Sequence, residues 1–100
     1  MNLVELKRIT IISEALLEER LLADIRRLGA RGYTVTEVRG EGSRGVRASE
    51  WEGNNIKIET IVAPEIALTI LAWLSERYFV SYAVIAYQET VEVVRGEKYV

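Results

Sequence analysis

The chain has 100 residues, of which 49% are hydrophobic and 28% charged, with one proline and a formal net charge of −2. This length allows a single domain spanning residues 1–100, and the composition is typical of an ordered globular protein. The absence of cysteine and histidine excludes disulfides, thiolate or imidazole metal sites and most enzymes that pair a nucleophile with histidine. The slightly acidic balance argues against nucleic acid as a partner, and the lack of an apolar leader or spanning run predicts a cytoplasmic protein.

The first part of the chain has the pattern of a strand, a helix and a second strand. Residues 5–12 predict a strand, and Ser13 after it is a candidate helix cap. Residues 14–28 predict a helix that ends before Gly29, since apolar residues recur there at steps of four, four and three: Leu17, Leu21, Ile25 and Leu28. The β-branched and aromatic run at 33–38 predicts the second strand.

The rest of the chain repeats this alternation in the order strand, helix, strand. Residues 55–62 predict the third strand, and Pro64 fits the first turn of a second helix that runs to about Tyr78. The wide apolar face of that helix predicts that it is mostly buried. Two extended stretches follow, at 80–87 and at 90–94.

The order β-α-β-β-α-β predicts an α+β protein of the ferredoxin-like class, with an antiparallel sheet and two helices on one face. The other face of the sheet must be solvated or covered. Because residues 80–87 are apolar on both faces of their expected strand, we expect that face to be covered in an oligomer. The segment between the second and third strands is unusually long for a connection.

That segment contains Gly40-x-Gly42-x-x-Gly45, the spelling of a dinucleotide-binding fingerprint. The fingerprint requires a helix to open directly after the third glycine, and the following residues have no helical apolar period. A Walker loop is also excluded, because Val46 and Arg47 replace the lysine and the hydroxyl residue that grip phosphate and magnesium. The motif is therefore neither of these two nucleotide loops.

A more general anion site remains compatible with the same residues. Residues 39–47 carry three arginines and one glutamate, a local formal charge of +2 on an acidic protein. Backbone N–H groups of the glycines can converge on an anion, Ser43 adds a hydroxyl, and Arg44 and Arg47 offer forked donors that match phosphate. The simpler alternative is a hairpin loop with ordinary solvated arginines.

Two stretches resemble the PII signal-transduction family. The run GARGYTVTEVRGEG, residues 29–42, is similar to that family's second strand and T-loop base, and KIETIVAP, residues 57–64, is similar to its third strand. The resemblance implies a homotrimer that binds adenine nucleotide in the clefts between subunits. It also implies that a T-loop, about residues 39–54 here, senses the nucleotide and docks on a protein target such as a membrane transporter.

The T-loop base GSRGVR, residues 42–47, resembles the PII-like proteins that accompany bicarbonate transporters and carboxysome gene clusters. That branch implies ADP, AMP or cyclic AMP as ligand, with inorganic carbon as context and bicarbonate as a further candidate ligand. ATP should be held poorly, because Glu92 and Val94 stand where the family has paired arginines and because the glycine-rich loop after the second helix is absent. No glutamine matches the one that helps the family to bind 2-oxoglutarate.

The resemblance also implies which residues form the nucleotide site. The phosphate is assigned to three side chains and to the backbone of three glycines: Ser43, Arg44, Arg47, Gly40, Gly42 and Gly45. The residues that match the adenine and ribose positions are Thr34, Glu59, Ile61 and Val62. Arg95 and Gly96 resemble the turn over the nucleotide. All of the strand positions also suit ordinary strand residues, and the turn could simply end a strand.

Trp51 is a large aromatic residue in a loop, which favours a partner anchor or a lid over ligand, although it could also fold back on its own subunit. Two other functions are alternatives to a regulatory binding protein. A slow adenine-nucleotide hydrolase using the same cleft would have only Glu41, Glu50 or Glu59 as a base. An RNA-binding domain would need an aromatic sheet motif and a basic sheet face, which the sequence does not provide. We therefore expect a regulatory protein rather than an enzyme.

Overall fold

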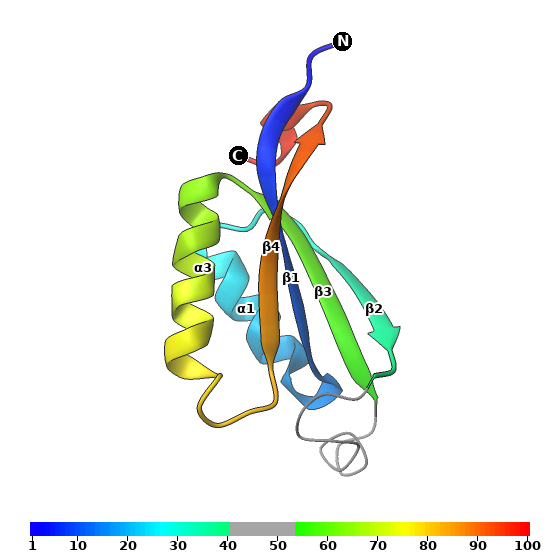
Figure 1. Cartoon of the computed structure of the whole chain (residues 1–100), viewed down its shortest axis with the longest axis vertical. Coiled ribbons are helices and arrows are strands. Elements are labelled where there is room, and N and C mark those ends of the chain that lie inside the picture. The colour runs from blue at the N-terminus through cyan, green and yellow to red at the C-terminus, as the bar shows by residue number, and fades with distance from the viewer. Residues whose placement is uncertain (41–53) are drawn as a thin grey trace.

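The structure is a computed structural model that describes residues 1–40 and 54–100. Its elements follow the predicted order of strand, helix, two strands, helix and strand, with one short 3-10 turn before the first helix and another after the last strand (Figure 1). They are β1 (Val4–Glu14), η1 (Ala15–Leu17), α1 (Glu18–Leu28), β2 (Thr34–Val38), β3 (Asn55–Val62), α3 (Pro64–Arg77), β4 (Ile85–Val93) and η2 (Gly96–Lys98).

The four strands form one sheet in the order β2-β3-β1-β4, and every neighbouring pair is antiparallel. Both helices lie on the same side of this sheet (Figure 1). The predicted α+β, ferredoxin-like arrangement is therefore confirmed. In the register, Thr34 pairs with Glu59 and Arg8 pairs with Glu89, so residues far apart in the sequence become neighbours on the sheet.

The hydrophobic core lies between the sheet and the two helices. Apolar side chains from the two central strands and from one stripe of each helix are buried there: Ile9, Ile11, Ile56, Ile58, Val62, Leu21, Ile25, Ala67, Ile70 and Leu74. Because successive strand residues point to opposite faces, the residues between these positions, including Arg8 and Glu59, belong to the open face of the sheet. The open face is where the polar residues of the central strands gather.

The first helix differs from the prediction at its start. Ser13 is not a cap, because it belongs to β1, which runs to Glu14, and its hydroxyl donates to the Glu14 carbonyl oxygen at 2.8 Å. The chain then makes the η1 turn before α1 begins at Glu18. The end is as predicted, since Gly29 takes a φ of 125° and its N–H donates to carbonyl oxygens of the last turn.

The second helix begins at Pro64 and ends at Arg77, as predicted. The expectation that it is mostly buried is wrong within the single chain. Ala67, Ile70 and Leu74 are buried, but Leu68 on the outer face is 63% exposed. The apolar residues of this helix thus cover a wide part of its surface, but only those on the side that faces the sheet are buried.

The last strand is one element, β4, rather than the two predicted stretches at 80–87 and 90–94. Residues 80–84 are not strand, because the chain is still turning after α3: the N–H groups of Ser81 and Tyr82 both donate to the Tyr78 carbonyl oxygen. From Ile85 onward the chain pairs with β1 without a break, up to Val93.

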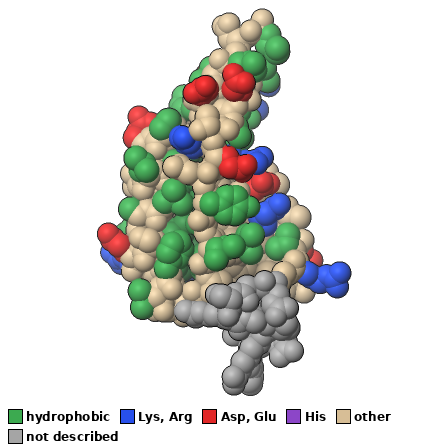
Figure 2. All heavy atoms as spheres, in the orientation of Figure 1, with side chains coloured by type: hydrophobic (Ala, Val, Ile, Leu, Met, Phe, Trp, Pro, Cys, Tyr) green, Lys and Arg blue, Asp and Glu red, His purple; other side chains and the backbone are tan. Residues whose placement is uncertain are grey.

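Hydrophobic side chains reach the surface on the side of the molecule that carries β4 (Figure 2). On the open face of the sheet, Ile85 is 56% exposed and Tyr87 is 46% exposed. Within the described ranges, no helix combines the length and apolar character needed to cross a membrane.

Candidate functional site

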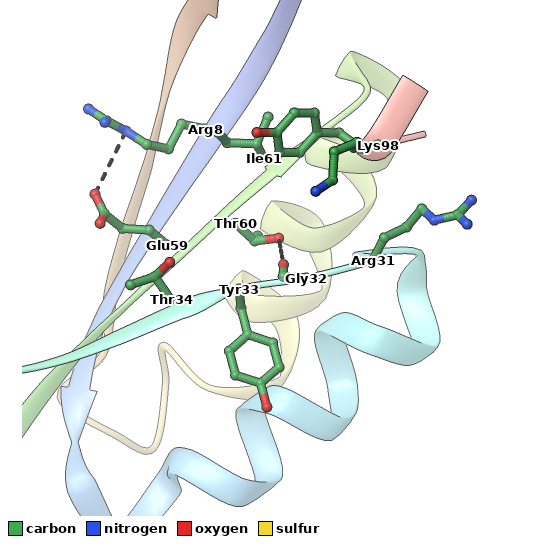
Figure 3. A pocket seen from close by; sticks show the side chains of 10 residues that line it. Arg8, Arg31, Gly32, Tyr33, Thr34, Glu59, Thr60, Ile61 and Lys98 are labelled. Carbon is green, nitrogen blue, oxygen red and sulfur yellow. Dashed lines mark hydrogen bonds and ion pairs between the residues drawn. The ribbon is translucent and has the colours of Figure 1, made fainter. Parts of the chain in front are cut away.

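A hollow of about 450 Å³ lies beside the start of β2, where four parts of the chain meet. Its walls come from β1, from the residues that lead into β2, from β3 and from the segment that follows β4 (Figure 3). The lining residues are Arg8, Arg31, Gly32, Tyr33, Thr34, Glu59, Thr60, Ile61, Lys98 and Tyr99.

The hollow is built on the pairing of β2 with β3. Thr34 and Glu59 are register partners at the start of β2, so their side chains leave the same face of the sheet. Next to them, the Thr60 hydroxyl donates a hydrogen bond of 2.6 Å to the Gly32 carbonyl oxygen, which fastens the residues before β2 to β3. The backbone at this end of β2 is therefore held in place by a neighbouring strand.

One end of the hollow carries an acidic group beside a cation. Among the lining residues that the structure describes, Glu59 is the only acidic one. The Arg8 Nε atom lies 3.8 Å from Glu59 Oε2, while the Arg8 Nη2 and Nε atoms donate to Glu89 Oε1 at 2.7 and 3.2 Å. The hydrogen bond and charge of Glu89 raise the pKa of Arg8, with Glu59 adding a smaller effect. Both carboxylates therefore favour the charged form of the guanidinium.

The other end of the hollow carries two more cations. Lys98 comes from η2, and its side chain points toward the hollow, whereas the side chain of Arg31 points away from it (Figure 3). Arg31 Nη1 donates to the Val100 backbone oxygen at 2.7 Å, which ties the end of the chain to the segment before β2. With Arg8 and Lys98 as cations and Glu59 as a carboxylate among the described lining residues, the hollow suits a ligand that offers both hydrogen-bond donors and negative charge.

Three of the four residues expected around adenine and ribose lie together in this hollow: Thr34, Glu59 and Ile61. Val62 does not join them, because its side chain is 1% exposed and belongs to the core under the helices. The physical reason is the alternation of strand side chains, since Ile61 and Val62 are neighbours and must point to opposite faces. The role of these residues as nucleotide ligands stays a prediction.

The predicted turn at Arg95 and Gly96 lies just before the segment that lines the hollow. Arg95 adopts a left-handed φ of 59°, and a Cβ on Gly96 would meet the Val4 side chain at 3.0 Å. Neither residue is among the lining residues, but Lys98 and Tyr99, which follow them, are. The turn thus directs the end of the chain back over the hollow.

The remaining predicted site residues are placed as follows. Gly40 is described and lies two residues beyond the end of β2, outside the hollow. The other residues assigned to phosphate or to a partner lie outside the described residues: Gly42, Ser43, Arg44, Gly45, Arg47 and Trp51.

Several lining residues were not predicted from the sequence: Arg8, Arg31, Gly32, Tyr33, Thr60, Lys98 and Tyr99. Arg8 had a usable signal, because strand side chains alternate and Arg8 precedes the apolar run of Ile9 and Ile11, which marks the buried face. Arg31 and Gly32 lie within the stretch GARG that precedes the second strand. Lys98 and Tyr99 gave no signal, since only the tertiary turn after β4 brings them to the hollow.

Comparisons with known proteins agree with this architecture. The family model for nitrogen regulatory protein P-II matches residues 6–98. A solved structure described as a PII-like signaling protein from Thermus thermophilus is 63% identical, with 100% of both chains covered and a TM-score of 0.88.

Two structures of CPII from Thiomonas intermedia are each 25% identical to the chain and cover 98% of it. One, a nitrogen regulatory PII-like protein bound to ADP, AMP and bicarbonate, is covered over 96% of its own length with a TM-score of 0.85. The other, bound to ADP and bicarbonate, is covered over 97% with a TM-score of 0.86. Because the family model spans nearly all of the described sheet and both helices, the chain belongs to the nitrogen regulatory protein P-II family.

Proposed function

We propose that this PII-like signalling protein senses ADP and AMP, with cyclic AMP as a further candidate, and that the hollow beside β2 holds the base and ribose of the nucleotide. The observation that carries the proposal is that Thr34, Glu59 and Ile61, the residues matched to adenine and ribose, line one hollow. The proposal is also supported by CPII of Thiomonas intermedia, which is 25% identical over most of both chains and is described as bound to ADP, AMP and bicarbonate.

The phosphates extend from this hollow along the edge strand β2 and its neighbour β3. Thr34 pairs with Glu59 at one end of these strands and Val38 pairs with Asn55 at the other, a span of roughly 13 Å at about 3.3 Å per residue. The T-loop is inserted at the second end. We propose that its Ser43, Arg44 and Arg47, with the amides of Gly40, Gly42 and Gly45, take the phosphate groups.

The signal leaves the protein through the T-loop of a trimer. Exposed apolar side chains on the open face, such as Ile85 and Tyr87, support subunit contacts there. Each nucleotide then lies in a cleft between subunits, and Arg95 with Gly96 forms a turn near it. We propose that Trp51 anchors the T-loop on a protein target, most simply a bicarbonate transporter or a carboxysome-linked regulator, with bicarbonate as a co-ligand of the nucleotide.

Calorimetry with ADP, AMP, cyclic AMP and ATP, with and without bicarbonate, tests the proposal. ADP and AMP should bind, and ATP should bind more weakly. Arg44→Ala and Arg47→Ala should each weaken ADP binding about tenfold or more, since a charged hydrogen bond contributes about 1.5–3 kcal/mol. Arg77→Ala on α3, far along the chain from the T-loop, is the matched control and should bind as the original chain does.

Failure of all four nucleotides to bind would overturn the proposal. Sustained release of phosphate from ADP or ATP, abolished by Glu59→Gln, would instead support the slow hydrolase that shares the same cleft.

A further inference from the structure

We infer that Arg8 is a positioning residue that holds Glu59 in place to accept hydrogen bonds from the two ribose hydroxyls, and that Glu89 keeps Arg8 in the position where it can do so. The chain Glu59–Arg8–Glu89 thereby makes the site selective for ribonucleotides over deoxyribonucleotides. This inference deepens the proposed nucleotide-binding function and rests on it.

The three residues come from three adjacent strands of the sheet. Arg8 is on the central strand β1, Glu59 is on β3 to one side and Glu89 is on β4 to the other. Figure 3 shows the Arg8 side chain at the edge of the hollow, joined to Glu59 by an ion pair. The lining residues include Arg8 and Glu59 but not Glu89. Glu89 therefore acts on the hollow only through Arg8.

Arg8 contacts the two glutamates at different distances, so it is hydrogen-bonded to one and only ion-paired with the other. Glu89 Oε1 accepts hydrogen bonds of 2.7 and 3.2 Å, whereas Glu59 Oε2 lies 3.8 Å from Nε, beyond hydrogen-bonding distance. Arg8 thus attracts the Glu59 carboxylate by charge and leaves its lone pairs available. A carboxylate is an acceptor with no donor, so two neighbouring hydroxyl groups match its two oxygens.

The same geometry explains why Glu89 is needed. Without Glu89, the guanidinium is free to fork onto Glu59 and to occupy the oxygens that the ribose requires, because arginine prefers bidentate contact with a carboxylate. Without Arg8, nothing described in the hollow holds the 29% exposed Glu59 side chain in one orientation. Loss of either residue is therefore expected to weaken the preference for ribose. Loss of Glu89 does so because Arg8 occupies the Glu59 oxygens, and loss of Arg8 does so because the Glu59 side chain is no longer held.

Calorimetric titration with ADP and with 2′-deoxy-ADP tests the inference on the full chain, Arg8→Gln and Glu89→Gln. The full chain should prefer ADP about tenfold, the equivalent of about 1.4 kcal/mol for a hydrogen bond to a charged group. Both variants should reduce that preference to about twofold or less. The matched control is Lys7→Gln, which removes the neighbouring cation of β1, bonded to Thr90 on the opposite face at 2.7 Å, and should keep the tenfold preference.

The outcomes separate the inference from the proposed function. If the full chain binds neither nucleotide, the proposed function fails and the inference fails with it. If it binds ADP but does not distinguish 2′-deoxy-ADP, or if both variants keep the preference, the inference alone is overturned. An equal loss of affinity for both nucleotides in Arg8→Gln also overturns it, because that pattern indicates a direct contact with phosphate. Thermal unfolding of each variant verifies folding, and Glu89→Gln, which removes the charge that holds Arg8 away from Glu59 with little change of shape, provides the test if Arg8→Gln does not fold.

Discussion

The Thr60 hydroxyl donates a hydrogen bond of 2.6 Å to the carbonyl oxygen of Gly32, and this bond joins β3 to the residues that lead into β2. Thr60 is almost fully buried and sits on the helix side of β3, opposite Ile9. The bond therefore fixes the floor of the hollow from beneath, while Glu59 and Ile61 on either side of Thr60 face the hollow.

Replacement of Thr60 by valine should test this anchor, because valine keeps the shape and removes the hydroxyl. We expect the free energy of unfolding to fall by about 1–2 kcal/mol, as the part-buried carbonyl loses its partner. Urea denaturation measures this change in the free energy of unfolding. Thr69→Val is the control: the Thr69 hydroxyl also bonds a backbone oxygen, that of Glu65, but on the exposed surface of α3. A fall of equal size in both variants would contradict the anchoring role.

Asp24 joins the two helices on the far side of the sheet from the hollow. Its Oδ2 atom accepts a hydrogen bond of 2.5 Å from the Tyr78 hydroxyl and one of 3.1 Å from Trp73 Nε1. Tyr78 is fully buried, and the guanidinium of Arg20 lies 4.9 Å from its ring centroid. Burial, and then the hydrogen bond to Asp24, raise the pKa of Tyr78 to about 12.

This pKa predicts a loss of stability at high pH that depends on Tyr78. An unfolded tyrosine releases its proton near pH 10, whereas folded Tyr78 keeps it to about pH 12. Between these values the folded state binds more protons, so stability falls with rising pH, by up to about 1.4 kcal/mol per pH unit. The free energy of unfolding, measured from pH 8 to 12, should therefore decline less steeply with rising pH in Tyr78→Phe. Tyr87→Phe, on the half-exposed open face, should follow the original chain, and parallel profiles for all three proteins would refute the assignment.

Gly29 ends α1 in a conformation that other residues rarely adopt. Its φ is 125°, and a Cβ at this position would meet Ile66 Cδ1 at 3.0 Å. Gly29→Ala should therefore cost about 1–3 kcal/mol of unfolding free energy through backbone strain and crowding against α3. Gly32→Ala is the matched control three residues later, where nothing lies within 4 Å of a Cβ. Urea denaturation that gives equal values for the two variants would contradict this account.

Most of the fold was predictable because local signals agreed with the tertiary structure. The third strand and the second helix begin and end within one residue of their predicted bounds, since β-branched alternation marks β3 and Pro64 marks the start of α3. The prediction was wrong where tertiary contacts, and not the local sequence, determine where an element begins or ends. Ser13 resembles a cap in sequence, yet the pairing of β1 with β3 extends the strand through it.

The candidate site was predictable where it lies on paired strands and unpredictable where distant segments meet. The resemblance pointed to Thr34, Glu59 and Ile61, and the register of β2 and β3 brings them to one hollow. Val62 was grouped with them, but its side chain lies in the core, because strand side chains alternate and its neighbour Ile61 faces the hollow. Lys98 reaches the hollow only through the turn after β4, a tertiary feature that no local pattern encodes.

A charge on the open face of the sheet should disrupt the proposed trimer. Ile85→Glu places a carboxylate on an apolar side chain of β4 that is 56% exposed in the single chain, and burying that charge in a subunit contact costs several kcal/mol. We expect light scattering after gel filtration to show a trimer for the original chain and mainly monomer for the variant. Leu68→Glu is the matched control, since Leu68 is 63% exposed on the outer face of α3, and it should remain trimeric. Were the charge at Leu68 to dissociate the subunits while that at Ile85 did not, the contact would lie on the helices and not on the sheet.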